Sequence, residues 1–299
     1  MDGIGMPFYF GDRFLEMSVD HGLGTTFERF SIYLWLEELT HRYPFETVLE
    51  GPGDGVAGIP GIHSLALARQ GRCVTVCLDD QRALQIARRG WDAQECQAQW
   101  VHVAGLPLPF ADRSFDLVWN FNRLPFLPAS ALAMEMVRVS RRYVGLVVPN
   151  RYNYGFPARR LYHRRTGLDW PYGDVSVMTP SAVQALLSRC HVQVLETKWL
   201  DVPWWPDIID PLAWVRAMVP GGGRWFSSLQ RGHRQKAGQY RWDPDHLPYF
   251  DPHTYADVHR RIARLGWLER ALPRPLQMPF AHHFAILAVR ENGRKMGNR

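Results

Sequence analysis

The residues with the clearest chemical potential follow a short apolar run, "TVLE", that ends at Glu50. The next residues, "GPGDGVAG", contain a G-x-G-x-x-G spacing through Gly53, Gly55 and Gly58, and Asp79 follows about 20 residues later. Taken alone, this spacing favours a dinucleotide such as NAD(P). Glycine lets the backbone approach a ligand closely, and the start of a helix favours negative charge. Other nucleotide-like cofactors would therefore fit as well, and a plain tight turn remains an alternative.

The acid before the glycines separates these interpretations. Glu50 ends the expected strand, and a carboxylate at that point repels a pyrophosphate group by like charge. The same carboxylate suits a cofactor that carries an ammonium or sulfonium group. The residues therefore favour a cationic cofactor over a dinucleotide.

The elements that must position these residues alternate along the chain. Continuous apolar runs predict strands, and apolar residues at helical spacing predict helices. We expect strands at 45–50, 73–80, 98–105, 114–122, 143–150, 191–202 and 282–290, and helices at 25–42, 62–71, 81–90, 129–141 and 178–190. Thr25 and Glu28 form a capping-box pattern for the first helix, Thr179 and Pro180 begin the last one, and Gly90 is expected to stop the helix that starts at residue 81.

Strands that are apolar on both faces indicate a mostly parallel sheet covered by helices on both sides, an open doubly wound α/β fold. In such sheets ligands bind beyond the carboxyl ends of the strands. We expect a single domain over 1–299. It would consist of an N-terminal helical cap at 1–43, a Rossmann-like core at 44–202 and 276–292, and a Trp/Pro/Arg-rich insertion at 203–275 that acts as a lid.

A second motif makes the interpretation specific. The run "LPFADRSFDLV", Leu108 to Val118, resembles the L-P-F-x-D-x-S-F-D-L-V run of class I S-adenosylmethionine-dependent methyltransferases. The resemblance covers about residues 44–202 and 276–290, and it implies seven strands with the last one antiparallel, an enzyme, and S-adenosylmethionine as cofactor. It implies contacts to the methionyl part from Glu50, Gly51, Gly53 and Gly55, contacts to the ribose from Asp79 or Asp80, and a cleft position for Asn120.

The chain departs from that family's pattern in its glycine loop and at its adenine site. The glycines fall one, three and five residues after Glu50 rather than two, four and six, and the loop carries about six extra residues. Ala104 replaces the usual aspartate at the adenine, where backbone groups near Gly105 and Leu106 would substitute. These departures leave two alternatives open: an NAD(P)-dependent oxidoreductase, and a non-catalytic partner protein that kept the methyltransferase fold.

The acceptor side is less defined, because the family shares no single catalytic side chain. His163, Tyr154, Asp201 and His282 are the candidates. His282 and His283 are expected to face opposite sides of the last strand. We predict no metal site, because the Asp and His residues of "WDPDHLPYFDPH" are typical of turns.

Composition limits the remaining possibilities. The chain has 299 residues, 46% of them hydrophobic, which is ample for a buried core, and a net charge of +6 with a pI near 9.3 favours anionic partners. We expect a cytoplasmic protein with free thiols, a small-molecule or lipid-like acceptor, and possible peripheral membrane contact. A nucleic-acid substrate is disfavoured because the basic residues are scattered. The sequence leaves the oligomeric state and the acceptor atom open.

Overall fold

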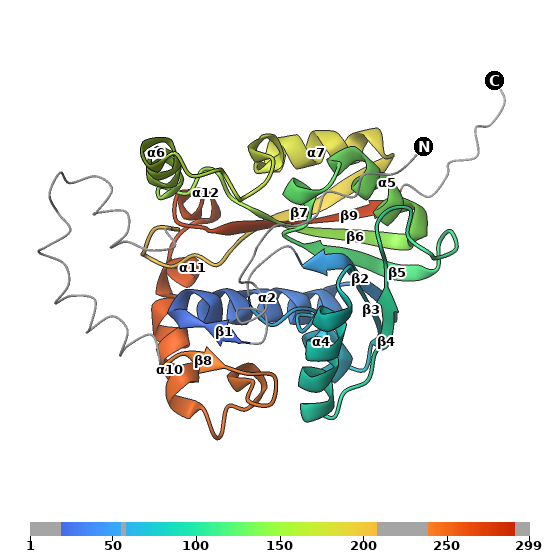
Figure 1. Cartoon of the computed structure of the whole chain (residues 1–299), viewed down its shortest axis with the longest axis horizontal. Coiled ribbons are helices and arrows are strands. Elements are labelled where there is room, and N and C mark those ends of the chain that lie inside the picture. Colours follow the sequence, from blue (N-terminus) through green and yellow to red (C-terminus); the bar gives the residue numbers. More distant parts are fainter. Residues whose placement is uncertain (1–18, 55–57, 208–238, 291–299) are drawn as a thin grey trace, which may run out of the picture.

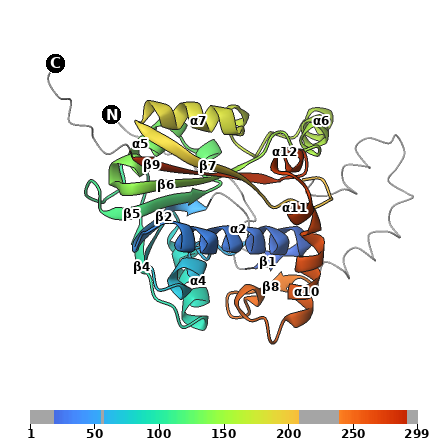
Figure 2. The same ribbon diagram turned by 180° about the vertical axis from the view of Figure 1, so that it is seen from behind.

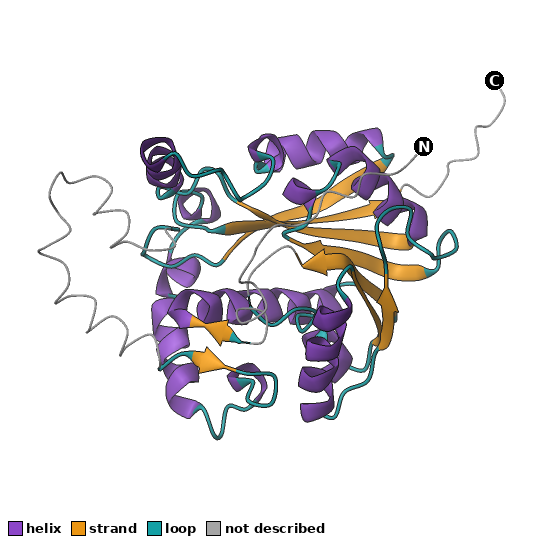
Figure 3. Cartoon of the chain, in the orientation of Figure 1, coloured by secondary structure: helices purple, strands orange, loops and turns teal. Residues whose placement is uncertain are grey.

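The structure is a computed structural model that describes residues 19–54, 58–207 and 239–290. Its centre is a seven-stranded sheet (Figures 1 and 3). In chain order the strands are β2 (Thr47–Asp54), β3 (Cys73–Leu78), β4 (Gln99–His102), β5 (Phe115–Phe121), β6 (Ser140–Pro149), β7 (Val192–Leu200) and β9 (His283–Arg290). In space the order is β4-β3-β2-β5-β6-β9-β7. β9 runs antiparallel to both β6 and β7, whereas the other pairs are parallel, as the sequence predicted.

Helices cover both faces of the sheet. α2 and α4 lie on one face and α5 and α7 on the other, as two opposite views show (Figures 1 and 2). The helices are α2 (Gly22–Arg42), α3 (Leu65–Arg69), α4 (Gln81–Ala93), α5 (Ala129–Val139), α6 (Phe156–Thr166), α7 (Pro180–Arg189), α10 (Ala256–Leu265), α11 (Trp267–Ala271) and α12 (Arg274–Gln277), with short 3-10 turns at Leu124–Phe126, Val175–Val177 and Pro248–Phe250. The doubly wound α/β prediction is confirmed.

Alternation along the strands builds one core on each face. In β5, Leu117 and Trp119 pack into the core beneath α2, whereas Val118 between them packs into the core beneath α5 and α7. All three side chains are fully buried. A strand apolar on both faces is therefore the expected signature of this central position.

A two-stranded ribbon lies outside the main sheet. β1 (Asp20–His21) pairs antiparallel with β8 (Arg241–Trp242), and the backbone N–H of Gly22 donates to the Tyr240 carbonyl at 2.6 Å. The segment before α2 is thereby joined to residues just ahead of α10. Within the part of the chain that the structure describes, no helix is long and apolar enough to cross a membrane.

Two helix boundaries differ from the prediction. α2 begins at Gly22 rather than after Thr25, and the Thr25 hydroxyl donates to the His21 carbonyl, so the proposed capping box does not form. α4 continues through Gly90 to Ala93, and Gly90 keeps a helical backbone and packs beside Ile62 and Pro244, so it does not act as the predicted stop.

One further helix is shorter than predicted, and another begins as predicted. The helix expected at 62–71 is reduced to Leu65–Arg69, because residues 59–64 run as turns. Thr179 caps α7 as predicted, with its hydroxyl accepting from the Ala182 N–H at 3.2 Å. The sequence of residues 210–219 also suggests a helix, but these residues lie outside the part of the chain that the structure describes.

Candidate active site

The glycine loop forms the end of β2 and lies close to the end of β3. Gly51 has a φ of +140°, and a Cβ there would lie 2.5 Å from the Cys77 carbonyl oxygen, so no larger residue fits between these strands. Gly53 has a φ of +62°, a left-handed conformation that favours glycine. A Cβ on Gly53 would point between Asp79 and the Arg123 side chain, 3.4 and 3.5 Å away. Gly51 is thus required by close approach and Gly53 is favoured by its left-handed backbone, whereas Gly55 lies outside the described residues.

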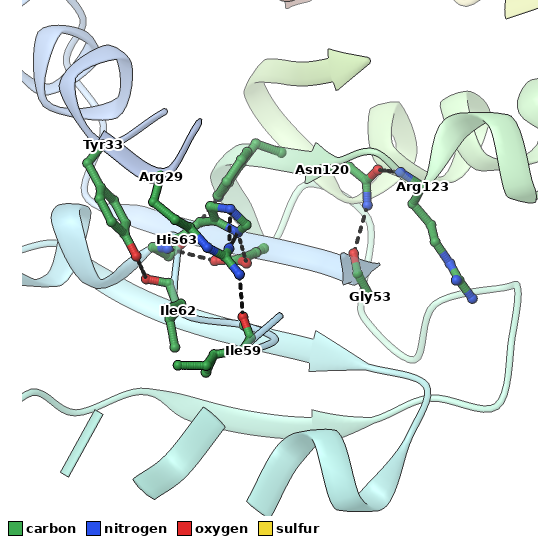
Figure 4. Close-up of polar contacts among 12 residues, drawn as sticks. Arg29, Tyr33, Gly53, Ile59, Ile62, His63, Asn120 and Arg123 are labelled. Carbon is green, nitrogen blue, oxygen red and sulfur yellow. Dashed lines mark hydrogen bonds and ion pairs between the residues drawn. The ribbon is translucent and has the colours of Figure 1, made fainter. Parts of the chain in front are cut away.

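Asn120 braces this loop from the neighbouring strand β5. Its side-chain N–H2 donates to the carbonyls of Pro52 and Gly53 at 3.4 and 3.2 Å, and its Oδ1 accepts from the Arg123 N–H at 3.0 Å (Figure 4). Asn120 is fully buried. Its amide therefore fixes the backbone of the loop, which is a supporting role that its sequence position at the strand end did not by itself reveal.

The two aspartates after β3 have different roles. Asp80 caps α4 by accepting from the backbone N–H groups of Arg82 and Ala83 at 2.7 and 3.2 Å. Asp79 faces the glycine loop instead, forms an ion pair with Arg123, and remains 33% exposed. Of the pair, Asp79 is the one whose carboxylate lies beside Gly53 and stays partly exposed.

Glu50 lies beneath the loop. Its side chain is 1% exposed, its Oε2 accepts from the Ser64 N–H at 2.8 Å, and burial raises its pKa to about 7. The Ser64 hydroxyl accepts in turn from the Trp119 indole N–H at 2.8 Å. The predicted contact between Glu50 and a cofactor stays a prediction, and the observed hydrogen bond ties the end of β2 to the residue that precedes α3.

Arg29 of α2 clamps the segment that follows the glycines. It forms a two-pronged ion pair with Asp20, donates to the Ile59 carbonyl at 2.7 Å and contacts the His63 ring (Figure 4). Asp20 also accepts from the Ile59 N–H at 2.8 Å. Gly58 is pressed against this pair, because a Cβ there would lie 2.5 Å from Asp20. The third glycine of the G-x-G-x-x-G spacing therefore makes room for the N-terminal cap.

The predicted adenine side is less constrained. Gly105 is exposed and Leu106 is half-buried, just beyond β4, and a cis peptide bond joins Leu106 to Pro107. Asp116, the second acid of the motif, lies at the amino ends of the strands, away from the glycine loop. There it accepts from the backbone N–H groups of Glu46 and Thr47. It thus ties the start of β5 to the start of β2. A depression at that edge, lined by Arg42 and Arg72 among others, lies away from the glycine loop.

A second group of polar side chains gathers where β7 ends and β9 begins. His282 Nδ1 lies 3.0 Å from Asp201 Oδ2, and His283 Nδ1 lies 3.6 Å from the same oxygen. Although burial opposes both shifts, the mutual attraction of the pair lowers the pKa of Asp201 to about 2 and raises that of His282 to about 9. The expectation that the two histidines face opposite sides is wrong, because the strand begins only at His283.

Glu28 and Asn122 complete this group. The Asn122 side-chain N–H2 donates to His283 Nε2 at 2.9 Å, and the same nitrogen lies 3.7 Å from Glu28 Oε2, while burial raises the pKa of Glu28 to about 7. Asn122 follows β5 by one residue and Glu28 belongs to α2. Together with Asp201, three segments that are far apart in sequence thus converge on one histidine.

Two other candidates lie in different surroundings. His163 of α6 packs edge-on against the rings of Trp170 and Tyr172. The Tyr154 hydroxyl donates to the Trp204 carbonyl at 2.6 Å. Asp201 and His282 are therefore the two predicted catalytic candidates that the structure places together.

Sequence reasoning missed Arg29, Arg123, Glu28, Asn122 and His283 as members of the site. Glu28 was assigned to a capping box, Arg29 had no assigned role, and His283 was interpreted as a packing residue. Asn122 and Arg123 offered a signal, because both directly follow a buried strand at the edge where ligands bind.

The donor-side residues fit a cofactor with a ribose and an amino acid tail. Gly53 permits close approach, and Asp79 presents a partly exposed carboxylate that can accept hydrogen bonds from ribose hydroxyls. The Arg123 guanidinium lies beside both, which puts one positive charge within reach of a ligand carboxylate.

Comparisons with known proteins agree with this geometry. Residues 56–142 match a family model described as a methyltransferase domain. No curated protein sequence matches the chain significantly. Among solved structures, MccD protein is 11% identical with a TM-score of 0.50, covering 87% of this chain and 96% of its own.

Two further structures match at lower TM-scores. The YcgJ protein of Bacillus subtilis is 14% identical with a TM-score of 0.48, over 88% of this chain and 99% of its own. The magnesium protoporphyrin IX methyltransferase of Synechocystis, solved with bound SAH, is 16% identical with a TM-score of 0.47, over 61% of this chain and 80% of its own. Residues 56–142 thus resemble a methyltransferase domain, and the sheet has the seven strands and the antiparallel β9 that the resemblance to class I S-adenosylmethionine-dependent methyltransferases implies.

Proposed function

We propose that the protein transfers a methyl group from S-adenosylmethionine to a small-molecule or lipid-like acceptor at the carboxyl edge of the sheet. One observation carries the proposal: Asn120 near the end of β5 braces the donor loop, and Asn122, one residue past that strand, contacts the second polar group through His283. A donor above Gly53 and an acceptor beside His283 would therefore lie beside two residues that are only two positions apart in the chain.

Methyl transfer from a sulfonium is an in-line displacement, and the cofactor supplies the electrophilic methyl group when bound. The protein has to align nucleophile, methyl carbon and sulfur and to exclude water. On the donor side, Gly53 and Asp79 would hold the cofactor, and Asn120 would keep the loop rigid. On the acceptor side, Asp201 and His283 are more than nine-tenths buried, which supports a site from which water is excluded.

The other parts of the chain have proposed roles around this site. We infer that the cap at 1–43, the core at 44–202 and 276–292, and the insertion at 203–275 work as one domain, with the insertion as a lid over the acceptor. The ribbon between β1 and β8 supports this inference. The free thiols of Cys77 and Cys190 support a cytoplasmic location, and the exposed Trp204 supports a bulky apolar acceptor or peripheral membrane contact.

A ligand-binding experiment tests the proposal. S-adenosylhomocysteine at about 100 times its Kd should raise the melting temperature by roughly 5–10 °C, and NADH or NADPH at the same concentration should leave it unchanged. Stabilisation by NADH alone would establish the oxidoreductase reading instead. Absence of binding by either ligand would favour the non-catalytic alternative, in which the Arg123–Asp79 ion pair closes the donor site.

A further inference from the structure

The polar group around His283 has the composition of a metal site. Glu28, Asp201 and His283 each offer one ligand atom, and these three atoms all lie within 4.8 Å of one another. Glu28 comes from α2, Asp201 follows β7 and His283 begins β9. Three separate elements thus deliver two carboxylates and an imidazole to one point.

Several polar atoms in this group are buried without a hydrogen-bond partner among the described residues: Asp201 Oδ1, His283 Nδ1 and Asn122 Oδ1. The three residues are 2%, 7% and 4% exposed, so bulk water does not satisfy these atoms. An unpaired buried polar atom costs about 1–3 kcal/mol. Three in one place indicate that the group is completed by something that accepts lone pairs.

The spacing also suits an ion. Ligand atoms about 2.1 Å from a tetrahedral metal are about 3.4 Å apart. Here one ligand atom from each of the three residues lies within 4.8 Å of the other two. Glu28 Oε2 lies 3.7 Å from His283 Nε2, whereas Asp201 Oδ2 lies 3.6 Å from the other ring nitrogen, Nδ1, so the side chains would have to rotate to bring both carboxylates to the same nitrogen.

The backbone of two residues in this group has an uncommon conformation. Five non-glycine residues among those described have a positive φ, and of these only Asn122 and Asp201 are buried, at +54° and +53°. Such conformations in buried residues concentrate at functional sites, where the surrounding structure enforces them. Both of these side chains contact or approach His283.

We propose that Glu28, Asp201 and His283 bind one divalent transition-metal ion, such as Mn²⁺ or Zn²⁺. Nitrogen together with carboxylate oxygen suits these ions, whereas Ca²⁺ and Mg²⁺ prefer oxygen ligands alone. Asp201 remains anchored because its Oδ2 pairs with His282 at 3.0 Å. Asn122 completes the ligand set through Oδ1 once its amide turns, since amide orientation is set by the hydrogen bonds available.

The role of the ion rests on the proposed function. A metal beside the donor would hold an acceptor through a hydroxyl oxygen and lower the pKa of that hydroxyl, as metals do for bound water. The acceptor class this favours is an alcohol or phenol with a second oxygen nearby that can share the ion.

The experiment uses the full chain and the metal alone. Protein is stripped with EDTA, incubated with Mn²⁺ or Zn²⁺ and desalted, and bound metal is counted by mass spectrometry. We expect about one ion per chain, lost in Glu28→Gln and His283→Gln. The matched control is His246→Ala, which removes the exposed histidine of another pair, 2.8 Å from Asp243, and should keep the ion.

Each outcome decides the proposal. Absence of a tightly bound ion, or binding that survives both Glu28→Gln and His283→Gln, overturns it. Should His283→Gln fail to fold, the visible absorption spectrum of Co²⁺ bound to the wild-type chain is measured in place of that variant. Nitrogen ligation shifts and strengthens the Co²⁺ absorption. A spectrum typical of oxygen ligands alone overturns the proposal. S-adenosylhomocysteine binding is measured in the same samples, so a failed metal site and a failed donor site are distinguished.

Discussion

The donor and acceptor halves of the site are built in opposite ways. On the proposed donor side, Gly53 and Asn120 lie near the ends of β2 and β5 and Asp79 directly follows β3, and these three parallel strands are neighbours in the sheet in the order β3-β2-β5. On the acceptor side, Glu28 and His283 come from opposite ends of the described sequence and meet through antiparallel β9. Repeated strand-helix units place successive loops at the carboxyl ends of the parallel strands. Residues remote in sequence reach the same place only through the antiparallel strand β9.

The two halves also differ in what holds them. The donor loop rests on a buried acid, Glu50, whose pKa of about 7 favours its neutral form below that pH, and on the Arg29–Asp20 pair. The acceptor group rests on the charged pair of Asp201 and His282. The following experiments test whether the two halves differ in this way.

The largest expected effect comes from removing the clamp on the donor loop. Arg29→Leu leaves Asp20 buried without its counter-charge, so we expect the free energy of unfolding to fall by about 3–5 kcal/mol in urea titrations. Arg260→Leu is the control, because its ion pair with Asp257 is exposed and should contribute less than about 0.5 kcal/mol. Equal losses in both variants would mean that the clamp is not a special support.

The next effect depends on pH. In the unfolded chain Glu50 loses its proton near its ordinary pKa of 4.5, whereas in the folded chain burial delays this to about 7. Folding therefore takes up a proton between these values, and wild-type stability falls as pH rises through them. Glu50→Gln does not titrate, so its stability relative to wild type should rise by on the order of 3 kcal/mol from pH 4.5 to 8. A difference that stays constant with pH would contradict the buried position of Glu50.

The two neighbouring aspartates separate binding from stability. Asp79→Ala should weaken S-adenosylhomocysteine binding by about 10- to 100-fold in calorimetry, because hydrogen bonds to a charged group contribute about 1.5–3 kcal/mol. Asp80→Ala should leave the Kd unchanged and cost about 1 kcal/mol of stability, since Asp80 caps α4. The reverse pattern would show that Asp80 is the ribose ligand.

The smallest effect concerns the backbone of the acceptor half. Asn122→Ala and Asn122→Gly both lose the contact with His283, but glycine tolerates a φ of +54° and alanine does not. In metal-free buffer, Asn122→Ala should therefore be less stable than Asn122→Gly by about 1 kcal/mol. Equal stabilities would show that the left-handed conformation relaxes once the side chain is gone.

The sequence predicted the sheet well because its signals are local. Continuous apolar runs such as 114–122 identify strands buried on both faces, and the Thr179 cap and Pro180 mark the start of α7. The errors arose where tertiary contacts override local preference. Gly90 is packed inside α4 beside Ile62 and Pro244 and does not end the helix, and Thr25 is not the cap because the ribbon with β8 fixes the start of α2 at Gly22.

The site was predictable to the extent that its residues follow a strand. Gly53, Asp79 and Asn120 could be found in this way, and the structure places them around one loop. Glu28 was read as a helix cap, but its side chain lies near His283, a residue more than 250 positions away in the printed sequence. Pairing between such distant positions depends on the register of β9, which residue types alone do not encode.

The ribbon formed by β1 and β8 has a mechanical consequence. Asp20, its first residue, accepts from the Tyr249 hydroxyl on one side and from the Ile59 N–H on the other. One carboxylate thereby fastens the polypeptide leaving the glycine loop to the segment that precedes the last strand. Because one carboxylate holds both segments, we expect the residues after the glycine loop and the region around Tyr249 to move together.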